Sequence, residues 1–545
     1  MSYVDCLYDR EHDTIHVVER VDGMRVYKEY PVNYIFYYDD PRGKFRSIYD
    51  TPVSRFATRN NKEFRREIRI QSGKQLYESD INPIFRCLEE NYKGKPSPEL
   101  HTAFFDIEVD FHKERGFSPT SDPFNSITAI SVYLQWLDQL VTLAIPPQHM
   151  SIETARELAA DFDNCMVFER EADMLNVFLD LIDDADILSG WNSEGYDIPY
   201  TVNRITRVLS KDDTRRFCLW GQTPKSRDFE RFGATSSTYD IAGRVHMDYM
   251  QLYRKYTYEE RHSYSLDAIA EYELGEHKTQ YEGTLDQLYN LNFKKFLEYN
   301  RQDTLILNKL DRKLKFIDLA NELAHDNTVL LPTTMGAVAV TEQAIINEAH
   351  ERGFVVPARP QRLTDEETAA AGAYVAVPKK GMHQWIGAVD INSLYPSAIR
   401  ALNMGMETVV GQLRPTMTEH YIDEQVAKHK KTVPGAWEGI FATLEYTAVM
   451  EKQRGTEITI DWQNKEKSIH SAAEIWEMIF NSNQPWMLTA NGTIVSYERK
   501  GVVPGLLERW YAERKTLQAK KSAIRQLEQG IAIPNDMAIK IQNFL

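Results

Sequence analysis

The stretch Phe105-Asp106-Ile107-Glu108 places two carboxylates at the end of an apolar run. Asp106 and Glu108 are two positions apart, so on a strand both side chains project from one face. A second acidic motif, Asp390-Ile391-Asn392-Ser393-Leu394-Tyr395-Pro396-Ser397, also ends an apolar run and lies 284 residues further on. Carboxylates at such positions suit a two-metal site for phosphoryl transfer.

Three further residues extend the first motif. Asp197 follows a predicted strand and loop at residues 187–196, and Tyr299 and Asp303 are four apart, hence on one helix face. Each residue alone is more often a surface acid, a helix cap or a core tyrosine, but all five occur in an order that lets them converge. Four carboxylates repel one another unless cations neutralise them, and hard oxygen ligands suit Mg²⁺ or Mn²⁺, two per active site.

The order of these motifs resembles the three motifs of the DEDDy 3′–5′ exonucleases, and it implies an RNase H-like fold for this part. The segments 248–253 and 263–267 are similar to the exonuclease domain of tailed-phage replicative polymerases. The resemblance implies that Asp106, Glu108, Asp197 and Asp303 bind metal and that Tyr299 positions the attacking water. It also suggests a β-hairpin at residues 232–243 that helps to part primer from template, although a plain surface hairpin fits as well.

The second motif resembles the first palm motif of family B DNA polymerases. This resemblance implies that Asp390 holds both metals and that the carbonyl of Ile391 holds one. Amides near Ser393 and Leu394 would face the triphosphate, as helix-start amides suit anions. Tyr395 would lie under the sugar and exclude a 2′-hydroxyl.

The last part of the chain resembles the start of the polymerase fingers. Gly501-Val502-Val503-Pro504 is followed by Arg514, whose guanidinium can bridge two phosphate oxygens of the incoming nucleotide. Lys540 resembles the lysine that opens the next fingers motif. The chain departs from the family pattern at Gln518, where a lysine is frequent, and at Phe544, where an asparagine is expected.

The Asp-Thr-Asp motif with the second palm carboxylate is absent from the 545 residues, as are the thumb and the clamp-binding tail. Two-metal nucleotidyl transfer needs a second ligand opposite Asp390. We expect that a C-terminal part supplies it. Either the chain is truncated or the polymerase is naturally split. We favour the split, because the chain starts with Met, carries no tag, and ends in a predicted helix with apolar residues that need a partner.

A chain of this length is too long for one core, so several domains are expected. We predict an α/β multidomain fold with a mixed α+β N-terminal domain at 1–100, to which 331–372 return. An exonuclease domain at 101–330, a partial palm at 373–500 and incomplete fingers at 501–545 follow. Strands are expected at residues 14–18, 34–38, 127–134, 187–192 (ending in a loop), 373–377 and 385–390. Helices are expected at 171–184, 338–352, after 396, at 505–527 and from 536.

Composition limits the setting of the protein. The net charge of −16 argues against nucleic-acid binding by itself, but residues 501–545 carry a net charge of +3 and a local basic patch matters more than the total. No run of about 18 apolar residues exists, so no membrane span is expected. The four cysteines are scattered and the N-terminus lacks a signal region. We expect the cytoplasm of a phage-infected bacterial cell.

The leading hypothesis is the N-terminal part of a DNA-directed DNA polymerase with a proofreading exonuclease. Its implied partners are primer-template DNA, deoxynucleoside triphosphates and a C-terminal polymerase chain. A sliding clamp and other replisome proteins would bind through the missing part, and RNA is a further candidate partner, through the N-terminal domain. The alternatives are a stand-alone 3′–5′ exonuclease and a nucleic-acid binding module without catalysis.

Overall fold

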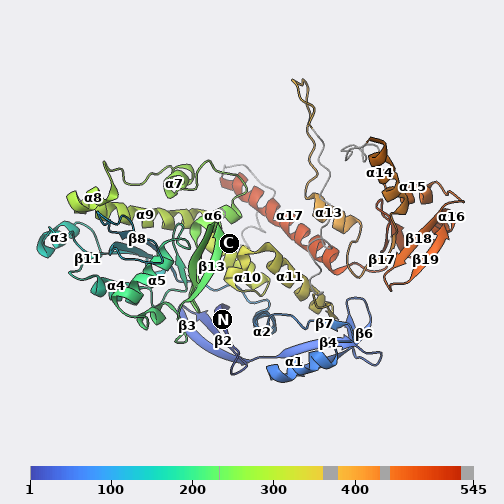
Figure 1. Ribbon diagram of the computed structural model, residues 1–545, viewed down its shortest axis with the longest axis horizontal. Helices are drawn as coiled ribbons and strands as arrows, with labels where there is room; N and C mark the ends of the chain where they lie inside the picture. The colour runs from blue at the N-terminus through green and yellow to red at the C-terminus, as the bar shows by residue number, and fades with distance from the viewer. Residues whose placement is uncertain (1, 232–233, 360–377, 430–441, 529–545) are drawn as a thin grey trace. The chain divides into compact units, whose positions relative to one another are not determined.

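The computed structural model describes residues 2–231, 234–359, 378–429 and 442–528 (Figure 1). The chain forms two compact units. The first unit comprises Met1–Phe36, Arg55–Lys74 and Glu78–Asn347, and the second comprises Tyr37–Ser54, Gln75–Tyr77 and Glu348–Leu545. No helix among the described residues is long and apolar enough to cross a bilayer.

A six-stranded sheet lies at the centre of the first unit, in the order β11-β10-β9-β8-β12-β15. Strands β8 and β9 pair antiparallel, as do β9 and β10, whereas β8 pairs parallel with β12. The strands are β8 (Thr102–Val109), β9 (Ile127–Leu134), β10 (Gln139–Ala144), β11 (Cys165–Val167), β12 (Ile187–Ser189) and β15 (Val245–His246). Every side chain of β9 is buried, because helices cover both faces of the sheet.

The alternation of side chains along β8 separates two cores. Phe105 packs with Phe178 and Ile205 on one face, and Phe104 packs with Tyr249 and Ile306 on the other. The first face is covered by α4 (Glu171–Leu181) and α5 (Asp197–Val208). The second is covered by α6 (Tyr249–Tyr256), α7 (Leu266–Leu274), α9 (Phe293–Leu314) and α10 (Phe316–Asp326). Asp106 and Glu108 share the face of Phe104, so they project toward the side of α9.

Other elements complete the first unit. Strands β13 (Lys225–Arg231) and β14 (Ala234–Asp240) form a hairpin, so the predicted hairpin exists but begins earlier in the chain than expected. The helices α1 (Asn61–Ile70), α2 (Pro83–Tyr92), α3 (Ile152–Ala159) and α8 (Leu285–Leu291) are short. Helix α11 (Ala337–Glu351) leads into the second unit.

The N-terminal strands β1 (Ser2–Asp9), β2 (Thr14–Val21) and β3 (Met24–Pro31) form a separate antiparallel sheet. Asp22 and Gly23 connect β2 to β3 with φ of 49° and 75°, as an Asp-Gly hairpin turn requires. Tyr3, Ile15 and Val17 of this sheet pack with Leu88 of α2.

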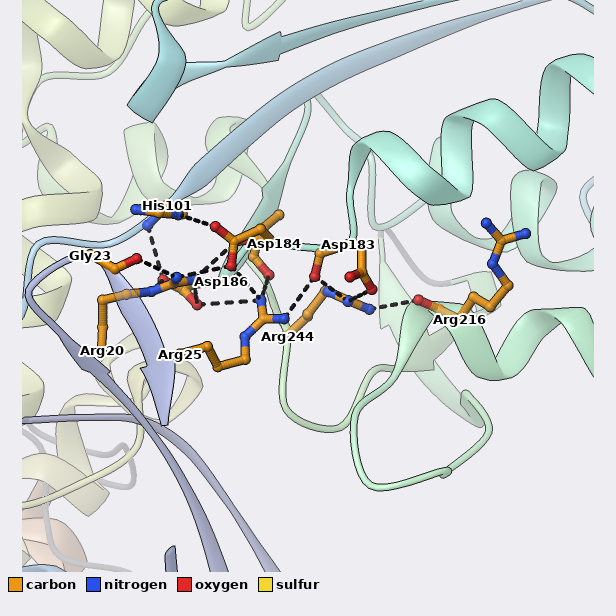
Figure 2. A network of polar contacts seen from close by, with 10 residues as sticks. Arg20, Gly23, Arg25, His101, Asp183, Asp184, Asp186, Arg216 and Arg244 are labelled. Atoms are coloured by element: carbon orange, nitrogen blue, oxygen red, sulfur yellow. Dashed lines mark hydrogen bonds and ion pairs between the residues drawn. The ribbon is translucent and has the colours of Figure 1, made fainter. Parts of the chain in front are cut away.

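An ion-pair network ties this N-terminal sheet to the start of β12 (Figure 2). Arg20 on β2 donates two hydrogen bonds to Asp186, from Nε at 2.9 Å and from Nη2 at 2.5 Å. The backbone N–H of His101 donates to the same carboxylate at 3.0 Å, and Arg25 lies 3.6 Å from it. Both Arg20 and Asp186 are buried, so each charge needs close, well-aligned partners to offset the cost of removing it from water.

The second unit contains one five-stranded sheet and most of another. The latter has the order β16-β5-β6-β4-β7, with residues 34–36 of β4 and 55–58 of β6 assigned to the first unit, and its parallel pair joins Phe354 to Arg46 and Val355 to Ser47. Its strands are β4 (Tyr34–Asp39), β5 (Phe45–Ser47), β6 (Pro52–Thr58), β7 (Leu76–Tyr77) and β16 (Phe354–Val355). This pairing supports the expected return of the chain after residue 331, which stays a prediction because 360–372 lie outside the described residues.

The other sheet of the second unit has the order β19-β18-β17-β21-β20. Its strands are β17 (Val409–Leu413), β18 (Glu457–Trp462), β19 (Lys467–Ser471), β20 (Trp486–Leu488) and β21 (Thr493–Ser496). Leu413, Ile460 and Ile494 pack with Val449 and Ile475 from the adjoining helices. The helices are α13 (Leu394–Ala401), α14 (Thr416–His429), α15 (Leu444–Met450), α16 (Ala472–Trp476) and the long α17 (Val502–Glu528).

One strand prediction is wrong. Residues 385–390 are irregular, with Trp385 99% and Val389 97% exposed. A strand exists only by pairing with a neighbour, and none of the described residues pairs with this segment. The expected strand at 373–377 and the helix from 536 lie outside the described residues. The other predicted strands and helices are present, with shifted ends.

We predict that Asp186→Asn lowers the free energy of unfolding of the first unit by about 1.5–3 kcal/mol, since it removes the buried charge that pairs with Arg20 and leaves Arg20 only its partly exposed pair with Asp184. Amide hydrogen exchange in β2 and β12 measures this loss locally. As a control, Arg170→Ala breaks an exposed pair with Asp173 and should cost less than about 1 kcal/mol. Equal protection in Asp186→Asn and wild type would contradict the prediction.

Candidate functional site

Three predicted acids meet between the central sheet and α9. Ligand oxygens of Asp106 and Glu108 on β8 and of Asp303 on α9 all lie within 4.8 Å of one another. Alternation along β8 turns the first two toward α9, and the helical repeat places Asp303 above them, with Tyr299 one turn earlier. Of the described residues, no other group of three or more acids, histidines or cysteines comes this close together.

Asp197 joins the same group from α5. It is the first residue of that helix, it is buried, and its Oδ1 accepts a hydrogen bond from the backbone N–H of Ile107 at 3.3 Å. Ile107 lies between Asp106 and Glu108, so the Asp197 carboxylate lies beside both. The structure therefore brings together the four carboxylates and the tyrosine that the sequence pattern selected.

Burial and mutual repulsion keep these acids short of full ionisation. Burial raises the pKa of Asp106 well above its usual range, and the charges of Glu108 and Asp303 raise it further. Burial and the charges of Asp303 and Asp197 raise the pKa of Glu108 to about 8. Burial also raises the pKa of Asp197 to about 7. Such a group holds its full negative charge only with cations beside it.

Among the described residues, Lys278 is the cation that lies in the group, and the sequence analysis missed it. Its Nζ donates to Oδ2 of Asp303 at 2.6 Å and to Oη of Tyr299 at 3.2 Å. Burial alone would lower the pKa of Lys278, but Asp303, Tyr299 and Asp106 more than offset this and raise it. The only signal in the sequence was indirect: four converging acids require positive charge, and no periodicity marks a lysine in a loop.

Asn300 is a second residue without an assigned role in the sequence analysis. It follows Tyr299 on α9, and its Nδ2 donates to Oδ2 of Asp106 at 2.9 Å. This hydrogen bond orients one carboxylate oxygen and leaves the other available to a ligand.

The site fits divalent cations. Oδ1 of Asp303 is buried without a hydrogen-bond partner, which a buried carboxylate oxygen rarely tolerates. Carboxylates are the hard oxygen donors that Mg²⁺ and Mn²⁺ prefer, and a single ammonium does not neutralise four of them. Asp106, Glu108, Asp197 and Asp303 would hold the cations.

The predicted second site has a different character. Asp390 and Ile391 lie in an exposed irregular segment, and α13 begins at Leu394 after Ser393, whose φ is +54°. Tyr395 is 72% exposed. No cluster of metal ligands surrounds Asp390 among the described residues.

Two predicted nucleotide-binding residues do meet in the second unit. Nη1 of Arg514, on α17, donates to Oγ of Ser393 at 3.3 Å. The guanidinium of Arg400, on α13, also lies over the ring of Tyr511, 4.0 Å from its centroid, so α13 and α17 pack together. Lys540 lies outside the described residues.

The raised pKa values predict how pH affects the metal-free chain. The stabilising protons on Asp197 and Glu108 are fully present below pH 4. They are lost as pH rises through the pKa of each group, about 7 for Asp197 and about 8 for Glu108. We expect the melting temperature in EDTA to fall between pH 6 and pH 8.5, by about 2–4 °C for each kcal/mol lost. Added Mg²⁺ should restore it.

A pair of variants isolates this effect. Glu108→Gln removes one titrating group and should flatten the fall in melting temperature between pH 6 and pH 8.5. The exposed Glu157→Gln should leave it unchanged. A fall of the same size in Glu108→Gln would contradict the assignment.

Two family models match the chain. The model for the exonuclease domain of DNA polymerase family B matches residues 53–269, and the model for DNA polymerase family B matches residues 331–542. The first match contains Asp106, Glu108 and Asp197, and the second contains Asp390 and Arg514.

Curated relatives agree with these matches. The DNA-directed DNA polymerase of Enterobacteria phage T4 is 30% identical over 259 residues, 47% of this chain and 28% of that protein. The enzyme of Escherichia phage RB69 is 26% identical over 403 residues, 70% of this chain and 44% of that protein. The DNA polymerase delta catalytic subunit of Bos taurus is 26% identical over 339 residues, which are 58% of this chain and 28% of that protein. The chain thus spans less than half the length of these relatives, and it belongs to family B of the DNA polymerases.

Proposed function

We propose that the first unit removes nucleotides from the 3′ end of DNA by two-metal hydrolysis. The observation that carries this proposal is the convergence of Asp106, Glu108 and Asp303 within 4.8 Å, in a buried site with Asp197 alongside. Two divalent cations held by these acids would activate a water and stabilise the leaving oxygen of a phosphodiester.

The residues around the acids have separate tasks in this proposal. Asn300 orients the carboxylate of Asp106, and Lys278 holds Asp303 and the hydroxyl of Tyr299 in place. The phenol of Tyr299, oriented in this way, positions the attacking water. The hairpin β13–β14 would help to part primer from template.

We further propose that the second unit is one half of a polymerase site. Asp390 and the carbonyl of Ile391 would hold metal, Ser393 and Leu394 would face the triphosphate, and Tyr395 would exclude the 2′-hydroxyl. Arg514 and Lys540 would contact the phosphates of the incoming nucleotide. The contact between Arg514 and Ser393 supports this arrangement.

The exposed segment around Asp390 supports the need for a C-terminal part. Met382, Trp385 and Val389 are each at least 94% exposed, and their backbone has no strand partner among the described residues. A polypeptide that adds strands here would cover the apolar side chains and bring the second carboxylate. We propose primer-template DNA and deoxynucleoside triphosphates as substrates, Mg²⁺ as cofactor, and the phage-infected cytoplasm as setting. A sliding clamp, other replisome proteins and RNA remain proposed partners.

We predict that the chain shortens a 5′-labelled single-stranded oligonucleotide stepwise from its 3′ end in Mg²⁺. The double variant Asp106→Ala, Glu108→Ala should slow this by at least about 10³-fold, the scale of losing a catalytic electrostatic group. A gel assay measures the products. The exposed pair Asp163→Ala, Glu169→Ala is a matched control and should retain the wild-type rate. Binding without any cleavage would favour the nucleic-acid binding module instead.

We also predict that the chain alone extends no primer, and that extension begins when a polypeptide with the second palm aspartate and the thumb is added. Asp390→Ala should abolish this extension and leave the exonuclease rate unchanged, because the two sites use different acids. Primer-extension gels measure both activities. A reconstituted pair that binds but does not extend would favour the stand-alone exonuclease.

A further inference from the structure

The loop of residues 190–196 determines where Asp197 lies. It connects β12 to α5, and the carbonyl of its Ser193 accepts the N–H of Ile198 at 3.0 Å. The loop has no room to shift at its start: a Cβ on Gly190 would lie 2.9 Å from the carbonyl oxygen of Phe105. Asn192 has φ of +64°, so the turn is tight. Any displacement of this loop moves the carboxylate of Asp197 away from Asp106 and Glu108.

The buried carboxylate of Asp248 accepts hydrogen bonds from the backbone of this loop. Its Oδ1 accepts the N–H groups of Asn192 at 3.1 Å and of Met250 at 2.9 Å, and its Oδ2 accepts the N–H of Glu194 at 3.2 Å. Asp248 is 6% exposed. One carboxylate therefore joins the loop to the N-terminus of α6, through charge-assisted bonds that are stronger than neutral ones.

His246 and Arg227 also make polar contacts with the loop, but both contacts are weaker. Nε2 of His246 lies 2.9 Å from Oγ of Ser193, a contact between neutral groups because burial lowers the pKa of this histidine to about 3. Arg227 of the hairpin donates to Glu194 at 2.8 Å, but its side chain is 43% exposed, so water screens the pair. Asp248 combines a buried charge with two loop N–H groups.

We propose that Asp248 is a positioning residue of the metal centre: it fixes the loop 190–196 so that Asp197 faces the other three acids. This inference rests on the proposed metal-dependent hydrolysis. Asp248 makes no hydrogen bond to Asp197. It acts through the backbone N–H groups of Asn192 and Glu194, and, after burial, its charge also raises the pKa of Asp197. Outer residues that orient metal ligands typically account for 10–100-fold in metal affinity.

Asp248→Asn separates this role from the capping of α6. An asparagine of the same shape keeps an oxygen at the Oδ1 position, so the bonds to Asn192 and Met250 remain. Its amide NH₂ then faces the N–H of Glu194, and two donors oppose each other. The variant should release the loop while α6 stays capped.

The experiment measures Mn²⁺ binding by electron paramagnetic resonance and amide hydrogen exchange in the full chain. In Asp248→Asn we expect the Mn²⁺ dissociation constant to rise about tenfold or more. Exchange should speed up at residues 192–197 but not in α6. Ser265→Ala is the control, because it removes the cap of α7 without touching the loop, and it should change neither quantity at the loop.

Two results would overturn the proposal. One is a Mn²⁺ dissociation constant within twofold of wild type although the loop exchanges faster. The other is an equal loss of protection in α6 and throughout the domain. If Asp248→Asn does not fold, Gly190→Ala decides the question, since it displaces the same loop and leaves Asp248 unchanged. It should weaken Mn²⁺ binding with α6 protected, and unchanged binding would refute the role of the loop.

Failure of the proposed function gives a different result. A wild-type chain that binds Mn²⁺ but cleaves no oligonucleotide refutes the hydrolysis. The exchange and binding comparison between wild type and Asp248→Asn still tests the positioning.

Discussion

Repulsion among four carboxylates, three of them buried and Asp106 half-buried, is the constraint on which the first unit depends. Asp106 and Glu108 are brought together by one strand, whereas Asp303 and Asp197 come from helices on opposite faces of the sheet. Removing these charged groups from water costs free energy, and the hydrophobic contacts of both cores offset this cost. Lys278 and partial protonation relieve part of the repulsion without metal. Cations relieve the rest, so metal binding and the stability of this unit are coupled.

The two predicted sites differ in how completely the described chain surrounds them. Around Asp106 every neighbouring element is paired or packed, and the acids are held by the backbone of Ile107 and the side chain of Asn300. Around Asp390 the backbone is unpaired and the apolar side chains face solvent. Nevertheless, α13 and α17 already place Arg514 beside Ser393. The two residues that we propose for the triphosphate side of the second site are thus in contact, whereas the segment proposed for its metal side has no strand partner among the described residues.

Predictions from residue spacing were confirmed where the geometry of a single strand or helix determines which side chains share a face. The two-residue spacing of Asp106 and Glu108 and the four-residue spacing of Tyr299 and Asp303 each fix a shared face, and the structure shows both. The prediction of a strand at 385–390 is wrong, because the local sequence pattern does not show whether a partner strand exists. Lys278 was missed, and Asp248 was noted only as part of the segment 248–253 without a role. Both act through contacts across 25 and 54 residues, which no local pattern records.

A comparison within the first unit argues that the unneutralised charge is functional. Asp183, Asp184 and Asp186 also cluster, but Arg20, Arg25 and Arg244 meet them (Figure 2). Burial alone would raise the pKa of Asp184, yet Arg20 and His101 lower it. The chain can therefore place arginines against clustered acids where the purpose is structural. It supplies one lysine to the four acids around Asp106, whose pKa stays raised. The fold thus neutralises one group of acids with arginines and leaves another with a single lysine. This difference argues that the second group binds cations.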